Sequence, residues 1–266
     1  MENLAPAAPG RIAPGPAEAT GAPRVNPTWP TTSRARWRWR WRAARLPRRV
    51  DPSGGAVAFR RPGGRELAAE EVLAGDTDPE AGVFTLDEAL AELPEGPGPL
   101  RAIIETDKGA LTCELFPDQA PNAVANFVGL ARGRRPWLDP ATGSWVKRRF
   151  YDGLSFHRVI PEFMAQGGDP LATGEGWPGY EFADEISALK HREGTLAYAN
   201  AGADTNGSQF YVTEVVADWL DGAYTIFGQC APVEVVTEMT HVETDADDKP
   251  RVELGLNKVT ITRCAP

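Results

Sequence analysis

Short apolar runs with the alternation of β-strands fill the sequence from Arg101 onward. The runs "AIIET" and "ALTCELF" flank an Asp-Lys-Gly turn, and Leu111, Cys113 and Leu115 of the second run alternate with small or polar residues. This alternation predicts a hairpin with one buried face. Similar runs follow, namely "LSFHRVI", "FMAQGG", "GTLAYA", "SQFYVT", "YTIFGQ" and "LNKVTITRC". Because free strand edges invite pairing with other chains, so many short strands favour a closed antiparallel barrel.

Two segments between these runs have helical spacing. "APNAVANFVGLARG" places apolar residues such as Val124, Phe127 and Val128 on one side, behind Pro121, and ends at Gly133. Proline in the first turn and glycine after the last turn are typical helix boundaries. "PVEVVTEMTHV" predicts a second helix near the C-terminus. We therefore expect a mainly β domain with two helices.

Charge and composition divide the chain into three regions. Residues 1–65 hold 13 Arg against 3 acidic residues, whereas residues 66–100 hold 10 acidic residues and no Lys or Arg. Residues 1–33 have almost no large apolar side chains and are predicted to be disordered. The run "PEGPGP" then marks a boundary. The predicted regions are a largely disordered basic extension at 1–65, an acidic, partly helical linker at 66–100 and a folded domain at 101–266.

The basic extension contains an unusual run in which Trp37, Trp39 and Trp41 alternate with arginines. As a strand, this run would carry tryptophans on one face and guanidinium groups on the other. Such a ribbon could contact RNA or an anionic membrane. The favoured alternative is an unstructured arm or a translated upstream region, so contact of this arm with nucleic acid or membrane is the weaker hypothesis.

Two short helical patterns lie in the acidic segment, "ELAAEEVLAG" and "TLDEALAEL". In the second, Thr85 can cap the helix and Glu88, three positions later, can complete a capping box. Neither pattern carries recognisable chemistry.

The cysteines, Cys113, Cys230 and Cys264, are too few and too far apart for a disulfide framework, and no spacing predicts zinc. We expect buried free thiols, with a Cys113–Cys230 bridge as the alternative if the protein is exported. The sequence has no long apolar stretch for a membrane span and no signal-peptide core. A cytoplasmic location is therefore expected, with an exported form if the start site is misassigned.

Three motifs go beyond a generic β-rich domain. They are "FHRVIPEFMAQGGDP" at 156–170, "ANAGADTNGSQFYVTE" at 199–214 and "DWLDGAYTIFGQC" at 218–230. Together, over about 160 residues, they resemble the cyclophilin family of peptidyl-prolyl cis-trans isomerases, as a single catalytic domain of bacterial type behind an N-terminal extension. The resemblance implies an eight-stranded barrel capped by two helices, with a substrate groove on its outer surface.

The resemblance also implies a role for each site residue. Arg158, which follows "FH", matches the catalytic arginine. The residues that match the proline pocket are Phe163, Met164, Tyr211 and Leu220, with Tyr224 at its edge. Those that match the groove and its peptide-backbone contacts are Gln166, Ala199, Asn200 and Gln209. Trp219 matches the tryptophan associated with cyclosporin, which makes a cyclosporin-type ligand an expected partner.

Some positions depart from the family pattern. Phenylalanine is usual at Tyr211, and a buried hydroxyl there would need a hydrogen-bond partner. Histidine is common at Tyr224. Because adjacent residues on a regular strand point to opposite faces, placing both Phe163 and Met164 in the groove requires an irregular strand end. The segment 134–149 is longer than in compact members, and we expect it to pack on the barrel rather than shape the groove.

The chemistry is consistent with these residues. An X-Pro bond rotates across a barrier of about 18–20 kcal/mol because amide resonance is lost in the twisted state. Since no bond is cleaved, we expect no metal, cofactor or nucleophile, only groups that favour the twisted amide, with Arg158 as the electrostatic one. The expected function is isomerisation of X-Pro bonds in peptides and folding proteins, by a monomer. The alternative is a proline-peptide binding module with weak or no turnover.

Overall fold

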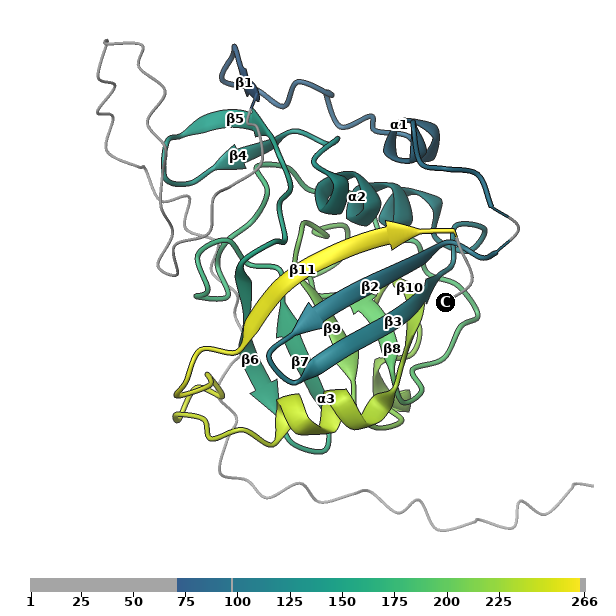
Figure 1. Ribbon diagram of the computed structural model, residues 1–266, viewed down its shortest axis with the longest axis vertical. Helices are drawn as coiled ribbons and strands as arrows, with labels where there is room; N and C mark the ends of the chain where they lie inside the picture. The colour runs from purple at the N-terminus through teal and green to yellow at the C-terminus, as the bar shows by residue number, and fades with distance from the viewer. Residues whose placement is uncertain (1–70, 97, 264–266) are drawn as a thin grey trace, which may run out of the picture. The chain divides into compact units, whose positions relative to one another are not determined.

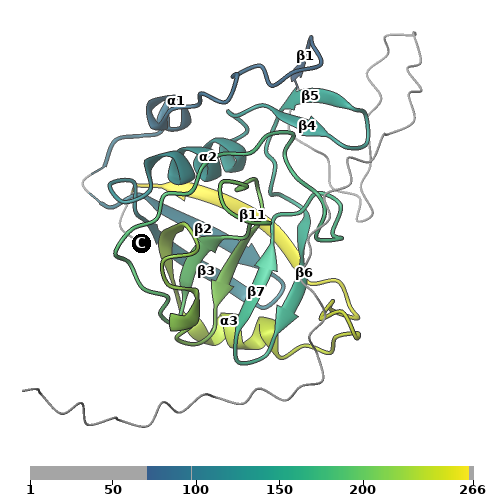
Figure 2. The same ribbon diagram turned by 180° about the vertical axis from the view of Figure 1, so that it is seen from behind.

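The computed structural model describes residues 71–96 and 98–263. Eight antiparallel strands close into a barrel in the order β10-β3-β2-β11-β6-β7-β9-β8, as the sequence predicted (Figures 1 and 2). The strands are β2 (Arg101–Thr106), β3 (Gly109–Leu115), β6 (Leu154–Ile160), β7 (Met164–Gly167), β8 (Thr195–Tyr198), β9 (Phe210–Thr213), β10 (Ile226–Ala231) and β11 (Gly255–Thr262).

Both expected helices are present, and they cover opposite ends of the barrel (Figures 1 and 2). They are α2 (Pro121–Arg132) and α3 (Val233–Thr240). Helix α2 begins with proline in its first turn, and Gly133 ends it at φ 71°, donating its N–H to the carbonyls of Gly129 and Leu130. This left-handed conformation is the one that favours glycine after a helix. The two signals seen in the sequence therefore fix both ends of α2.

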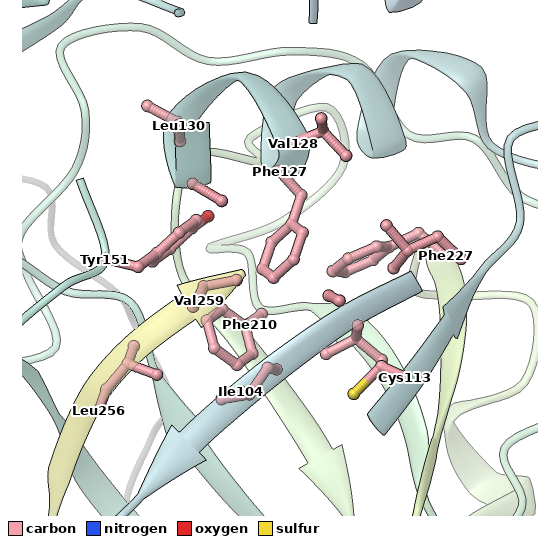
Figure 3. Packing of buried hydrophobic residues seen from close by; sticks show 14 of the residues in the cluster. Ile104, Cys113, Phe127, Val128, Leu130, Tyr151, Phe210, Phe227, Leu256 and Val259 are labelled. Atoms are coloured by element: carbon pink, nitrogen blue, oxygen red, sulfur yellow. The ribbon is translucent and has the colours of Figure 1, made fainter. Parts of the chain in front are cut away.

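The core lies between α2 and the inner face of the barrel. Phe127 of α2 points into the barrel, toward the rings of Phe210 and Phe227 (Figure 3). Their ring centroids lie 5.5 Å and 5.2 Å from that of Phe127, and that of Tyr151 lies 5.0 Å away. Aromatic pairs at these separations add to the free energy gained from burying their area. Phe127 thus joins the helix to β9, to β10 and to the segment before β6.

A second, three-stranded sheet has the order β1-β5-β4 and contains the long insertion. Its strands are β1 (Glu71–Leu73), β4 (Trp137–Asp139) and β5 (Ser144–Lys147). Trp137 is fully buried in the same core cluster as the barrel residues, and its ring meets Phe150 edge-on at 4.9 Å. The expectation that this insertion packs on the barrel is confirmed for Trp137.

The segment before the barrel bears out one of the two predicted helices. Helix α1 (Leu86–Leu90) has the expected capping box, in which the N–H of Thr85 donates to Glu88 Oε2 at 2.7 Å and the N–H of Glu88 donates to Thr85 Oγ1 at 3.3 Å. The helix expected at 66–75 is wrong for Glu71–Leu73, which form β1 instead. Antiparallel pairing with β5 supplies this strand with partners that a local helical pattern cannot reveal.

Phe84 attaches this segment to α2. Its ring occupies the space that a side chain at Gly129 would need. The guanidinium of Arg135 lies 5.4 Å from the ring centroid of Phe84 and 3.7 Å from that of Tyr180. Arg135 is 3% exposed, and its Nε and Nη2 atoms have no hydrogen-bond partner among the described residues. The arginine is held by aromatic faces, which attract a cation.

The cysteine expectation requires a correction. Cys113 and Cys230 face each other in the register of β3 and β10 and form a disulfide, so they are not free thiols. This is the bridge given above as the alternative, and it forms because two strands distant in sequence place these residues directly opposite. Cys264 lies outside the described residues.

The basic extension also lies outside the described residues. This applies to the predicted disorder at 1–33, to the Trp and Arg run and to the remainder of residues 1–65. Among the residues that the structure describes, no helix is long and apolar enough to cross a membrane.

We predict that Phe84→Ala destabilises the domain by about 3 kcal/mol, because it leaves a cavity over Gly129 and removes one ring from Arg135. Urea unfolding followed by tryptophan fluorescence measures this change. The neighbouring Val83→Ala is the matched control, since Val83 is 70% exposed and its truncation should stay within about 0.5 kcal/mol of wild type. Equal unfolding midpoints for the two variants would contradict the packing of this segment on α2.

Candidate active site

The register of the barrel strands aligns a row of side chains across one wall. Arg158 on β6 lies opposite Gln166 on β7, and Gln166 lies opposite Tyr211 on β9. The row continues through Ala197 on β8 to Ile226 on β10. Because directly opposed residues of neighbouring strands share a face, these side chains lie on the same side of the wall. The two motifs around Arg158 and Tyr211 therefore meet in space.

Alternation separates this face from the core. The residues next to these along each strand point to the other face. Examples are Val159, Ala165 and Val212, which belong to the core cluster inside the barrel. A second, smaller apolar cluster lies on the other face of the wall, and we call it the outer cluster. Its buried members are Met164, Ala197, Tyr211 and Ile226, and its partly buried members are Ile160, Phe163, Leu189, Ala199, Leu220 and Tyr224. Six residues assigned to the proline pocket or groove thus form one cluster with Arg158 beside it.

Phe163 and Met164 both belong to the outer cluster, as the irregular strand end required. Strand β7 begins at Met164, and Phe163 lies in the preceding turn, where its N–H donates to the carbonyl of Ile160 at 3.2 Å. Glu214 holds the same turn through a 2.8 Å hydrogen bond from the N–H of Glu162. Since Phe163 lies before the strand, the rule of opposite faces does not apply to the pair.

Arg158 is partly buried and contacts an acidic loop. Its Nε atom lies 3.5 Å from Asp248 Oδ2, and the carbonyl of Asp248 accepts a 2.9 Å hydrogen bond from the N–H of Val159. Burial lowers the pKa of Arg158, and the Asp248 carboxylate opposes this effect. A guanidinium remains protonated in proteins. Arg158 therefore presents a positive charge whose direction Asp248 helps to set.

Two glutamines connect the row to a glycine-containing loop. Gln166 Nε2 donates to Gln209 Oε1 at 2.9 Å, and Gln209 Nε2 donates to the carbonyls of Gly174 and Gly176 at 3.0 Å and 2.8 Å. The same loop is fixed by Asp169, which accepts hydrogen bonds from the N–H groups of Leu171, Thr173 and Gly174. Both amide side chains are buried and bonded, so their positions beside Arg158 are well defined.

Asn200 has a different environment from the other groove residues. Its Nδ2 atom lies 3.3 Å from Asp184 Oδ1 and 3.4 Å from Asn206 Oδ1. It does not belong to the outer cluster. Its neighbour Ala199 does, and the N–H of Ala199 donates to the carbonyl of Gln209 at 3.0 Å.

The third motif supplies the rim of the outer cluster. Trp219 and Leu220 lie on the short 3₁₀ helix η1 (Asp218–Leu220). Leu220 packs on the outer cluster, whereas Trp219 is 61% exposed and its ring lies 5.7 Å from that of Phe163. The ring of Tyr224 meets that of Tyr211 edge-on at 5.9 Å. An exposed tryptophan beside a buried apolar floor is suited to contact with a ligand.

The hydroxyl of Tyr211 has the partner that its burial requires. Tyr211 is 5% exposed, and its Oη atom lies 2.9 Å from Nε2 of His191. Burial raises the pKa of Tyr211 well above its ordinary value, so the phenol keeps its proton. The departure from phenylalanine is therefore accommodated by a histidine that the motifs did not identify.

His157 differs from His191 in lacking partners. It is buried next to Arg158, and neither ring nitrogen has a hydrogen-bond partner among the described residues. Burial lowers the pKa of His157, and the nearby charges of Arg158 and Lys249 act in the same direction, while Asp169 opposes them. The surroundings of His157 therefore favour the neutral form of its ring.

Sequence reasoning missed three polar residues around the site: His191, Asp221 and Asp248. His191 and Asp248 lie outside the three motifs, and Asp221 lies inside the third without an assigned role, because each meets its partner only through the fold. No group of three or more His, Cys, Asp or Glu side chains that could hold a metal ion occurs in residues 71–96 and 98–263.

Comparison with known proteins identifies this arrangement. Residues 101–264 match the family described as cyclophilin type peptidyl-prolyl cis-trans isomerase/CLD. The chain belongs to this family. Peptidyl-prolyl cis-trans isomerase B of Streptomyces anulatus is 44% identical over 168 residues, which span 61% of this chain and 93% of that protein. Peptidyl-prolyl cis-trans isomerase A of Mycobacterium tuberculosis H37Rv is 42% identical over 166 residues, or 60% and 91% of the two chains.

Solved structures agree with the cyclophilin assignment. A cyclophilin type peptidyl-prolyl cis-trans isomerase of Cryptosporidium parvum is 34% identical and superposes with a TM-score of 0.53, covering 62% of this chain and 98% of that one. The structure of the Cryptosporidium protein in the presence of the dipeptide Ala-Pro gives a TM-score of 0.52 at 34% identity, covering 60% and 98%. The cyclophilin fold predicted from three motifs is confirmed.

We predict that His157 makes the domain less stable in acid. Because its pKa is lowered in the folded state, the neutral ring contributes stability above the ordinary histidine pKa, and this contribution is lost as the pH falls through the folded value. Urea unfolding at pH 8 and pH 5 should therefore show a smaller loss of stability for His157→Leu than for wild type. Titration of the histidine Cε1–H signals by NMR gives the folded pKa directly. An equal pH dependence in both proteins would contradict this assignment.

Proposed function

We propose that this cyclophilin is a peptidyl-prolyl cis-trans isomerase that acts on X-Pro bonds of peptides and folding proteins, with Arg158 as its catalytic residue. The observation that carries the proposal is the row in which Arg158 lies opposite Gln166, beside the apolar outer cluster. A cation, a bonded amide and an apolar floor within one row are the groups that a twisted prolyl amide needs.

The proposed mechanism is electrostatic. The proline ring enters the outer cluster between Phe163, Met164 and Leu220, which are the pocket residues. Arg158 donates hydrogen bonds to the proline carbonyl and to the prolyl nitrogen as that nitrogen becomes pyramidal. A lone pair on the nitrogen exists only when amide resonance is broken, so this interaction favours the transition state over both planar isomers. Preorganised donors of this kind contribute most where charge develops.

Other groove residues hold the peptide backbone in this proposal. Gln166 and Gln209 offer the peptide the amide groups that are left beside their mutual hydrogen bond. Ala199 and Asn200 directly follow the end of β8 and offer their backbone groups there. Trp219 and Tyr224 form the rim of the pocket, and the exposed ring of Trp219 is the group that a cyclosporin-type ligand would contact. The Ala-Pro dipeptide of the Cryptosporidium structure is a minimal example of the substrate class.

A second candidate function is proline-peptide binding with little turnover. Two observations favour it. Asp248 lies 3.5 Å from the Arg158 guanidinium and competes for its donors, and Tyr211 replaces the usual phenylalanine of the pocket. Both features leave an apolar pocket for proline while changing the groups around the reacting amide.

The remaining proposals concern partners and location. The proposed oligomeric state is a monomer. Contact of the basic extension with nucleic acid or a membrane stays the weaker hypothesis. A cytoplasmic location stays a prediction. The Cys113–Cys230 disulfide supports the exported alternative instead, because such bonds persist mainly in oxidising compartments.

We predict that Arg158→Ala lowers kcat/KM for an Ala-Pro peptide by about 10²- to 10³-fold, the loss typical of removing one preorganised donor. A chymotrypsin-coupled assay or exchange NMR measures the rate. Peptide affinity should change much less, because the pocket is intact. Exposed Arg192→Ala is the matched control and should keep wild-type activity.

Equal, very low turnover of wild type and Arg158→Ala, with peptide binding retained in both, would reject the enzyme and support the binding module.

A further inference from the structure

A chain of three polar residues lies behind the outer cluster. Tyr211 Oη is 2.9 Å from His191 Nε2, and His191 Nδ1 is 3.0 Å from Asp221 Oδ1. The same carboxylate oxygen accepts a 2.8 Å hydrogen bond from the backbone N–H of His191. The residues come from β9, from the segment before β8 and from the end of η1. The His191 imidazole thus connects two other segments of the fold, β9 and the end of η1.

The protons in this chain can be placed from the acceptor at its end. Backbone and side-chain hydrogen bonds from His191 lower the pKa of Asp221, so the carboxylate is ionised and can only accept. Nδ1 of His191 must therefore donate, which leaves Nε2 as an acceptor for the Tyr211 hydroxyl. Burial lowers the pKa of His191 and outweighs the opposing hydrogen bond of Asp221, which agrees with a neutral ring.

The other groups facing His191 are few. Its ring stacks on that of Tyr211 with an interplanar angle of 10°, and the ring of Tyr224 meets it edge-on at 6.4 Å. Lys190 Nζ lies 3.4 Å from Asp221 Oδ2, on the exposed side of the carboxylate. The His191 side chain itself is fully buried. A charge on this ring would therefore be balanced mainly by Asp221.

We propose that His191 is a positioning residue for prolyl-peptide binding: it holds the Tyr211 hydroxyl away from the proline ring, so that the pocket floor presents only aromatic surface. This inference rests on the proposed function, because it assumes that proline occupies the outer cluster. A phenylalanine at position 211 would need no such partner.

The hydrogen-bond geometry makes this device sensitive to pH. When His191 is neutral, the single hydroxyl proton of Tyr211 is committed to Nε2. When His191 is protonated, Nε2 becomes a donor and the Tyr211 proton must turn elsewhere, toward the apolar floor formed by Met164, Ala197 and Ile226. An unsatisfied polar hydrogen there disfavours proline. Peptide binding should therefore weaken in acid, at pH values below the ordinary pKa of histidine.

The test uses the full chain and an Ala-Pro peptide, with kcat and KM measured separately between pH 5 and pH 8. Wild type should show a KM that rises several-fold in acid while kcat changes little. His191→Gln places a neutral amide near the position of Nε2 and should keep a KM close to wild type that no longer depends on pH. His191→Leu removes the acceptor and should raise KM about tenfold at every pH.

The double variant separates positioning from general folding. In a Tyr211→Phe background there is no hydroxyl to hold, so His191→Leu should change KM by less than about twofold. Thermal unfolding of each variant checks that the comparison concerns folded protein. A tenfold effect that persists without the hydroxyl would overturn the proposal, as would a wild-type KM that stays constant across the pH range.

Peptide binding measured by the change in tryptophan fluorescence distinguishes this proposal from the proposed function. Binding that weakens in acid for wild type but not for His191→Gln supports the role of His191 even if turnover is absent, a result that rejects only the enzyme. Normal turnover with a KM that is indifferent to pH and to His191→Gln and His191→Leu overturns only the role of His191.

Discussion

The packing of Phe127 against the inner face of the barrel is the contact on which the rest of the structure depends. Because α2 fills the barrel from one end, alternate residues of β7, β8 and β9 must point inward to meet it. Their neighbours are thereby forced onto the opposite face, where they form the outer cluster. A one-residue slip of any of these strands would exchange core and pocket. The site is therefore the reverse side of the core.

A wall buried on both faces restricts where polar groups can be tolerated. All four residues of β7 and all four of β9 are buried, yet β7 carries Gln166 and β9 carries Tyr211. Each finds a partner outside its own strand, the first in Gln209 and the second in His191. Satisfying these groups also fixes their direction, because leaving them unbonded would cost more than the bond contributes. Stability and preorganisation of the pocket have the same source here.

Local patterns predicted the elements of the fold that depend on local chemistry. Pro121 and Gly133 set the ends of α2, Thr85 and Glu88 form their capping box, and alternation located the barrel strands. The motif around Arg158 could be recognised because its members lie on one hairpin. His191 could not, because it meets Tyr211 and Asp221, which are 20 and 30 residues away in sequence, only through the tertiary fold. The same reason left the Cys113–Cys230 disulfide as only the alternative, since its cysteines are 117 residues apart, and it concealed the strand pairing of Glu71–Leu73.

The region that matches cyclophilins and the region that packs as one unit begin at different places. The family match begins at residue 101, but Phe84 and Ala89 already belong to the core cluster. Phe84 packs on α2 at Gly129, whereas Phe127 points from another face of the same helix into the barrel. The helix is thus buried from two directions, and residues before the matched region supply one of them. Since α2 positions the strands that carry the site, the acidic segment contributes to the same packing that holds Arg158 opposite Gln166.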